Sequence, residues 1–245
     1  MVDSNNSDCP TSWRQHLRAV ANRPIHRKNI VDDGFFSQMA EGADFESLLE
    51  IVKIKPPREH VRIDGAVPFS RLNKAGENDC TVFFENDPLF ADALLGIEEF
   101  SDELLKRACS TTDCSIYWDM PFVLQCANVY MSRLFGHALQ ELGHEEVYPT
   151  LRWADERTYK PYITEVPIAF LGLPKKSVYW IGSYGVCKTR EEKFHLKAGL
   201  ESALEYLQPK KLLIYGAMPS DIFGDYLDCT NFIQFPDWTT RQHGP

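Results

Sequence analysis

The longest regular pattern of apolar positions in the chain lies between Asp119 and Gly143. Apolar residues are so frequent there that they cover almost every side of a helix, which predicts burial on more than one side. Asp119 can cap the free N–H groups at the start, and Pro121 fits the first turn. Gly143 readily takes the left-handed conformation that ends helices. We therefore expect a buried helix that runs to about Leu142.

Three polar residues interrupt this apolar helix at three- and four-residue spacing, namely Gln125, Asn128 and Ser132, with Arg133 beside them. The spacing places the three on one face. Buried amides need partners, because an unpaired one costs about 1–3 kcal/mol. Two interpretations remain open: the stripe binds carbonyl groups of neighbouring loops, or it holds the loop that contains Asp113 in a working shape.

From residue 61 onward, short strand-like runs alternate with helical patterns. Strands are expected at 61–64, 81–85, 109–113, 146–153, 177–182, 211–216 and 231–235, with helices at 88–107, 119–142 and 189–207 and a short helix from 219. Such alternation predicts parallel strands joined by right-handed crossovers. The sequence therefore favours an α/β fold, a single-domain βα barrel of the TIM type that is possibly incomplete. A doubly wound sheet is the alternative.

The first 58 residues lack this alternation. They predict an arm with helices at 13–21 and 44–52, an irregular stretch at 25–42, and an end at Pro56-Pro57. We expect residues 1–58 to form a helical or irregular arm and residues 59–245 to form the barrel domain.

Composition and charge limit the class of protein. Lys and Arg number 26 against 35 Asp and Glu, a net charge of −9, which argues against a broad basic surface for gripping nucleic acid. A local basic cleft remains compatible. The seven cysteines form no CxxC pair, and there is no signal peptide or long apolar run. We expect a cytoplasmic protein with free thiols and no membrane span.

The predicted strand ends carry most of the candidate chemistry. The residues at these strand ends are Asp64, Glu85, Asp113, Arg152, Trp153, Gly182, Ser183, Tyr184 and Gly216. Carboxylates act as nucleophile, acid or base when their environments separate their pKa values. Trp153 and Tyr184 can stack on a flat ring, and glycines let the backbone approach it. The alternative is that each acid only caps the helix that follows.

Other signals are weaker. His137, Glu141 and His144 do not predict a metal site, because His144 lies beyond the helix end at Gly143. Cys187 has only Lys188 as a basic neighbour, which disfavours an activated thiol. No GxxxxGK[ST] or GxGxxG motif is present. We expect neither a metal nor a cofactor.

Several segments resemble a family of uncharacterised phage and prophage proteins that carry a domain of unknown function. The resemblance covers about residues 60–216. Its segments are Val82-Phe83-Phe84-Glu85-Asn86-Asp87, Thr112-Asp113-Cys114-Ser115-Ile116-Tyr117, Asp119-Met120-Pro121 with Gln125, Asn128 and Arg133, Tyr148-Pro149 with Arg152-Trp153, and Pro209-Lys210-Lys211-Leu212-Leu213-Ile214-Tyr215-Gly216. This family brings no established activity.

The segments 181–185 and 213–222 are also similar to the back half of tRNA-guanine transglycosylases, where they line the base pocket. By chain order, Asp113 with Cys114 then resembles the aspartate that reads the purine edge, and Asp64 resembles the acid/base aspartate. The family's nucleophile would correspond to Asp237, which is displaced along the chain, and the family's zinc motif is absent. Phage versions of this fold exchange guanine in DNA for a 7-deazaguanine.

The leading hypothesis is a phage-type enzyme that exchanges guanine in nucleic acid, DNA more than RNA, for a free deazapurine base. Its catalytic residues would be Asp64, Asp113 and Asp237. Its substrate-binding residues would be Ser115, Arg152, Trp153, Gly182, Tyr184 and Gly216. One alternative is a non-catalytic replication or interaction protein on the same fold. The other is a carboxylate-driven nucleoside or glycosyl hydrolase.

Overall fold

Eight short parallel strands form the centre of the molecule in the computed structural model, which describes residues 37–58 and 62–243. One four-stranded sheet has the order β3-β4-β5-β6 and the other the order β7-β8-β9-β10. The strands are β3 (Gly65–Pro68), β4 (Asp79–Val82), β5 (Cys109–Ser110), β6 (Val147–Tyr148), β7 (Thr150–Leu151), β8 (Val178–Gly182), β9 (Lys211–Tyr215) and β10 (Asn231–Phe235). Each strand pairs in parallel with its neighbour in the sheet.

The two sheets follow one another along the chain through Pro149, which separates β6 from β7. Proline has no N–H to donate to a ladder, so it interrupts the strand predicted at 146–153. Its carbonyl still accepts a hydrogen bond from the N–H of Trp180. The strand order is therefore the chain order, as in a βα barrel, and not the reversed order of a doubly wound sheet. The predicted α/β class is confirmed.

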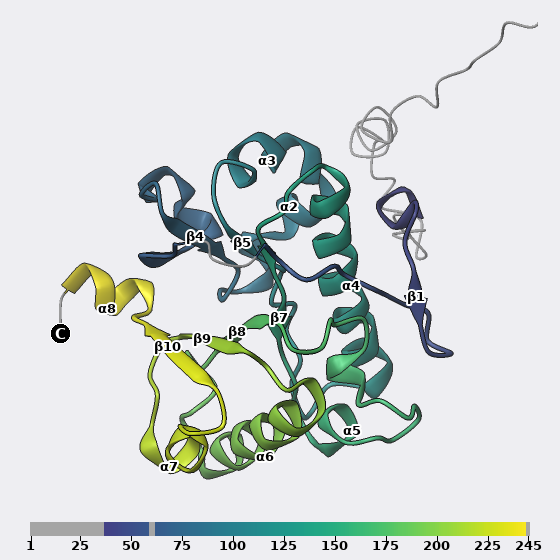
Figure 1. Cartoon of the computed structure of the whole chain (residues 1–245), viewed down its shortest axis with the longest axis vertical. Coiled ribbons are helices and arrows are strands. Elements are labelled where there is room, and N and C mark those ends of the chain that lie inside the picture. The colour runs from purple at the N-terminus through teal and green to yellow at the C-terminus, as the bar shows by residue number, and fades with distance from the viewer. Residues whose placement is uncertain (1–36, 59–61, 244–245) are drawn as a thin grey trace, which may run out of the picture.

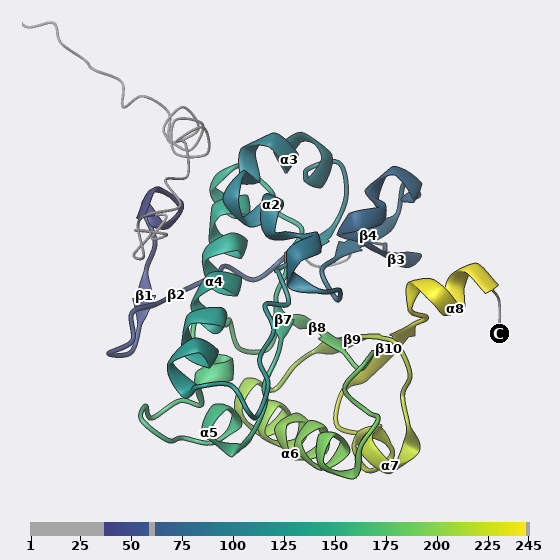
Figure 2. The ribbon, with the colours of Figure 1, turned by 180° about the vertical axis from the view of Figure 1, so that it is seen from behind.

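The sheets do not close into a barrel within the described residues, because β3 and β10 are not hydrogen-bonded to each other. Side chains from both sheets nevertheless share one buried cluster, which includes Tyr148, Trp180 and Phe235. The short helix α8 (Trp238–His243) lies between the β3–β4 pair and β10 in both views (Figures 1 and 2). From α8, Arg241 pairs with the buried carboxylate of Asp79 at 3.0 Å.

Helices cover the outside of the sheets (Figure 1). The long helix α4 (Phe122–Glu141) is buried along most of its second half, whereas Val123 and Leu124 in its first turn are exposed, so the predicted burial is confirmed only for the second half. Gly143 follows the helix with φ +92°, so its predicted end is confirmed. The helix α6 (Arg190–Leu207) begins with a reciprocal cap between Thr189 and Glu192. Shorter helices are α2 (Ala91–Leu95), α3 (Ile97–Leu104), α5 (Glu156–Tyr159) and α7 (Ser220–Phe223), with 3-10 turns η1 (Ser37–Ala40), η2 (Phe69–Lys74), η3 (Asp87–Leu89), η4 (Ile168–Phe170) and η5 (Gly224–Tyr226).

The helix predicted at 44–52 is wrong. This segment is a hairpin of β1 (Phe45–Glu46) and β2 (Ile51–Val52), with Ser47 and Glu50 at positive φ. Tertiary contacts override the helical pattern, because the carboxylate of Glu46 accepts a hydrogen bond from the N–H of Gly172 at 2.7 Å. Val52 belongs to the same core cluster as α4, and the helix predicted at 13–21 lies outside the described residues. The domain boundary at residue 58 stays a prediction.

Two further boundaries differ from the prediction. The helix predicted at 88–107 is broken at Gly96 into α2 and α3. The first strand lies at Gly65–Pro68 instead of 61–64, and all four of its residues are buried. A strand buried on both faces has no alternating pattern to locate it. None of the described helices is both long enough and apolar enough to cross a membrane.

Candidate functional site

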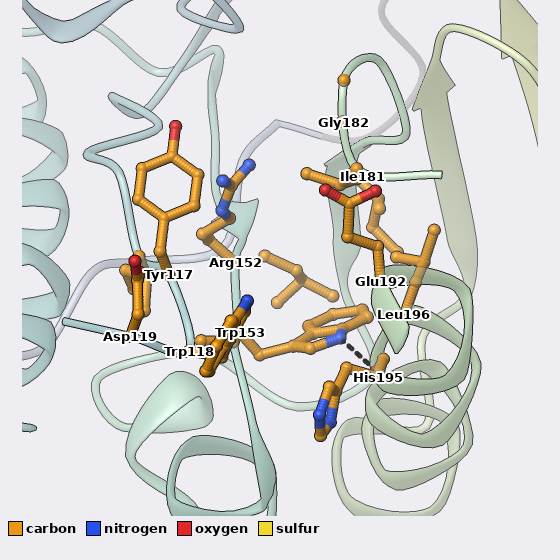
Figure 3. Close-up of a pocket in the computed structure, with 15 residues that line it drawn as sticks. Tyr117, Trp118, Asp119, Arg152, Trp153, Ile181, Gly182, Glu192, His195 and Leu196 are labelled. Atoms are coloured by element: carbon orange, nitrogen blue, oxygen red, sulfur yellow. Dashed lines mark hydrogen bonds between the residues drawn. The ribbon is translucent and has the colours of Figure 1, made fainter. Parts of the chain in front are cut away.

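A pocket of about 300 Å³ opens at the carboxyl ends of β7 and β8. One side comes from the loop between β5 and α4, and the other from α6 (Figure 3). The lining residues are Ile116, Tyr117, Trp118, Asp119, Leu151, Arg152, Trp153, Ala154, Ile181, Gly182, Gly185, Val186, Glu192, His195 and Leu196. This volume is at the lower end of the range for small-molecule sites, about 300–1,000 Å³.

The polar stripe of α4 fixes the shape of the β5–α4 loop. Ser132 donates a hydrogen bond to the carbonyl of Thr112 at 2.7 Å, and the Gln125 amide donates to the carbonyl of Met120 at 3.0 Å. Between them the Asn128 amide donates to the carbonyl of Ser115. The interpretation that the stripe binds loop carbonyls is confirmed, and these carbonyls belong to the loop that contains Asp113. The stripe therefore positions the wall that carries Tyr117 and Trp118.

Two arginines, Arg133 of α4 and Arg157 of α5, bind backbone carbonyls of other segments. Arg133 is fully buried and donates to the carbonyls of Leu171 at 3.0 Å and Ala169 at 2.8 Å. Burial lowers the pKa of its guanidinium to about 10. On the surface side, Arg157 donates to the carbonyl of Trp118 at 3.0 Å and is itself paired with Asp155. Both guanidinium groups thus cross-link segments that are distant in the sequence.

Trp153 forms the floor of the pocket, and α6 holds it there. Its indole N–H donates to the carbonyl of His195 at 3.0 Å, as the dashed line in Figure 3 shows. The ring lies directly against Gly199, where an added Cβ would sit 2.1 Å from the indole nitrogen. Only glycine fits at that helix position. The aromatic floor therefore depends on the absence of a side chain on α6.

Arg152 connects the pocket to a buried carboxylate. Its guanidinium donates to Asp113 at 3.1 Å and lies over the ring of Tyr117, 5.5 Å from the centroid. Asp113 is 7% exposed, and its second carboxylate oxygen has no hydrogen-bond partner in the described part of the chain. Desolvation raises the pKa of Asp113 to about 6, with Arg152 opposing the shift and Asp87 adding to it.

Two polar groups of α6, Glu192 and His195, complete the lining, and neither was among the residues predicted for the site. Glu192 accepts hydrogen bonds from the N–H groups of Lys188 and Thr189, each at 2.8 Å. The His195 ring bonds through Nδ1 to the hydroxyl of Tyr159 at 3.1 Å. The available signal was the Thr-x-x-Glu capping pattern, which places Glu192 in the first turn of the helix predicted at 189–207.

The helix predicted at 189–207 is confirmed as α6, but not all of its apolar side chains face inward. Phe194 is 64% exposed, whereas Leu196 is buried and lines the pocket. The apolar positions of α6 fit more than one rotation about its axis, and the packing of Trp153 against Gly199 selects the observed one.

Three of the predicted binding residues, Arg152, Trp153 and Gly182, line the pocket. Ser115 lies beside it and donates to Asp87 at 2.6 Å. Tyr184 is exposed and is not part of the pocket lining. Gly216 is a backbone feature: its φ is +112°, and an added Cβ would meet the Ser183 hydroxyl at 2.7 Å.

The predicted convergence of Asp64, Asp113 and Asp237 is wrong. Asp64 precedes β3, whereas Asp113 follows β5, so the two carboxylates lie at opposite edges of a parallel sheet. Asp64 is exposed and pairs with Arg62 at 2.7 Å, and this hydrogen bond lowers its pKa. The four-residue shift of the first strand is the cause, because it moves Asp64 from the carboxyl end to the amino end.

Asp237 does follow the carboxyl end of β10, but its carboxylate caps α8. It accepts hydrogen bonds from the N–H and the hydroxyl of Thr240, at 3.1 and 2.8 Å. The capping alternative therefore describes this residue. Among the described residues, no group of three or more His, Cys, Asp or Glu side chains is arranged to hold a metal ion.

Comparisons with known proteins point to phages. The chain is 30% identical over 161 residues to the Gene 1 protein of Mycobacterium phage L5, covering 65% of this chain and 66% of that protein. It is 34% identical over 135 residues to the Gene 1 protein of Mycobacterium phage D29, covering 55% of this chain and 46% of that protein. The matched part thus spans less than two thirds of each relative.

No solved structure matches the chain, and the comparisons give no support to the resemblance to transglycosylases. The predicted phage family is confirmed. A sequence model described as a domain of unknown function, DUF4417, matches residues 43–236, and the chain belongs to this family.

Proposed function

We propose that the protein binds an unpaired nucleic-acid base, in the first instance guanine, in the pocket at the ends of β7 and β8. The observation that carries the proposal is the combination of aromatic walls with polar groups on facing sides. Tyr117, Trp118 and Trp153 line the pocket, and Figure 3 shows Arg152 and Glu192 facing each other across its upper part.

These groups match the chemistry of a purine. Aromatic side chains stack on any base, worth about 1–3 kcal/mol per base. An arginine donates to acceptors such as guanine O6 and N7, and a carboxylate accepts from base amino groups. Arg152 and Glu192 supply one of each. A base in a duplex reaches such a pocket only after leaving its stack.

The finer proposal is base exchange in phage DNA, with a free deazapurine as the incoming base. Asp113 is the remaining candidate for proton transfer, because its pKa of about 6 lies near the working pH. Asp64 and Asp237 do not support this chemistry, since the first is at the opposite edge and the second caps a helix. A non-catalytic base-binding protein is the second candidate, and this dispersal of the carboxylates favours it.

Binding is tested by titrating the full chain with guanosine and with short single-stranded DNA and RNA that contain guanine. Trp118 and Trp153 line the pocket, so tryptophan fluorescence should change on binding. Trp118→Ala should weaken binding about tenfold or more, given the cost of one lost stacking partner. Phe45→Ala, at a similarly exposed aromatic residue on β1, is the matched control and should bind normally. Unchanged binding by Trp118→Ala would refute the proposal.

The reaction is tested with the same DNA and labelled guanine or 7-deazaguanine. Incorporated label indicates exchange. Release of base without incorporation indicates a hydrolase, and binding without either indicates the accessory role. Loss of incorporation in Asp113→Asn, with binding retained, supports proton transfer by this residue.

A further inference from the structure

The lining of the pocket contains more carboxylates than guanidinium groups, namely Asp119 and Glu192 against Arg152. The guanidinium of Arg152 already has an anionic partner, because Asp113 binds it at 3.1 Å with both side chains largely buried. At pH 7 this pair contributes no net charge when Asp113 is ionised. Arg152 is the only arginine among the described residues that line the pocket. Because it is already paired with Asp113, it does not neutralise a second anion.

Two carboxylates in the lining have no such partner. Glu192 accepts only backbone N–H groups, from Lys188 and Thr189. Asp119 is exposed on the opposite wall, in the β5–α4 loop. Neither forms an ion pair with any residue in 37–58 or 62–243. The pocket thus carries two carboxylates on facing walls that have no ion-pair partner among the described residues, and Glu192 is held by backbone N–H groups at the start of α6.

The aromatic lining adds to the same preference. Ring faces attract cations, by about 0.5–1 kcal/mol at exposed sites and about 2 when desolvated. Arg152 lies over Tyr117, which leaves Trp118 and Trp153 as the lining rings not covered in this way. A phosphate in the pocket would instead meet two carboxylates, which is unfavourable at short range.

We propose that this pocket selects positively charged heterocycles over neutral ones of the same size, and that it excludes the phosphate of a nucleotide. The inference rests on the proposed base-binding function and specifies its ligand class. Asp119 and Glu192 determine the selectivity, and the tryptophans provide the stacking surface.

The test uses two isomers that differ in charge. 1-Methyladenosine is protonated and therefore cationic at pH 7, whereas its isomer N6-methyladenosine is neutral and of nearly the same size. The full chain should bind the cationic isomer about tenfold more tightly, as one cation–π contact and one near carboxylate imply. AMP should bind more weakly than adenosine.

Substitutions then locate the preference. Asp119→Asn and Glu192→Gln should each reduce the ratio of the two affinities about threefold, with little effect on N6-methyladenosine. Glu191→Gln is the matched control, because Glu191 neighbours Glu192 in the first turn of α6 and is not part of the pocket lining. Glu192 also caps α6, so Glu192→Gln can change the start of the helix as well as the charge. Asp119 is exposed, so Asp119→Asn tests the effect of charge without this complication.

The outcomes separate this inference from the proposed function. Equal affinity for both isomers, with guanosine still bound, overturns the charge selection and leaves base binding standing. Preference for the cation that survives both substitutions overturns the roles of Asp119 and Glu192. Binding of neither isomer and no guanosine refutes both proposals.

Discussion

Gly199→Ala should displace Trp153, the residue that forms the floor of the pocket. The added Cβ would lie 2.1 Å from the indole nitrogen of Trp153 and 2.4 Å from two of its carbons. Trp153 is 7% exposed and packs edge-on to Phe170, so the ring has little room to yield. Any displacement also breaks its hydrogen bond to the carbonyl of His195.

Three contributions determine how much Gly199→Ala changes the free energy of unfolding. Overpacking costs about 1–3 kcal/mol, and the lost hydrogen bond costs about 0.5–1.5 kcal/mol. Alanine is favoured over glycine in a helix by about 1 kcal/mol, which offsets part of this. The free energy of unfolding should therefore fall by about 2 kcal/mol. For a chain of this size that lowers Tm by about 4–8 °C.

Urea unfolding followed by circular dichroism measures the stability, and guanosine titration measures the pocket. The matched control combines Gly199→Ala with Trp153→Phe, because the smaller ring leaves room for the methyl group. The double variant should lose less stability than the sum of the two single variants. If Gly199→Ala is as stable as the wild type and binds guanosine equally well, Trp153 is not held as described.

Three further predictions concern single charges. Burial raises the pKa of Asp113 from 3.8 to about 6, so the folded state holds this proton more tightly than the unfolded state. The stability from this group is present at low pH and is lost as the pH rises, by about 2 kcal/mol between pH 4 and pH 7. Asp113→Asn should lack this part of the pH dependence in urea unfolding. Arg133→Met leaves several buried carbonyls without a donor. It should lower the free energy of unfolding by about 3–5 kcal/mol in urea unfolding, and a loss below about 1 kcal/mol would contradict the hydrogen bonds described. Asp64→Asn should change neither stability nor base binding, because Asp64 is exposed at the opposite edge of the sheet; a loss of binding would show that the site is elsewhere.

Elements with strong local signals could be predicted from the sequence alone. The long helix before Gly143, the helix after Thr189 and the strand at 231–235 lie close to the predicted positions. Helical periodicity and caps are local properties, so they can be read without knowing the neighbours. The interpretation that the polar stripe on α4 binds carbonyls of a neighbouring loop is confirmed, and the structure shows that this loop contains Asp113.

The edge of the sheet at which each acid lies could not be read from the sequence pattern and follows from the three-dimensional fold. Asp64 precedes a short strand that is buried on both faces, and such a strand has no period that fixes its start. Its placement decides whether three carboxylates meet or lie apart. A shift of a few residues therefore changed the candidate chemistry without changing the fold class.

The remaining pocket residues depended on packing between distant segments. Glu192 and His195 face the pocket because Trp153 packs on Gly199 and fixes the rotation of α6. That contact joins residues about 40 positions apart, and no local pattern encodes it. The sequence supplied the arginine and the aromatic rings, and the three-dimensional packing decided which acids they face.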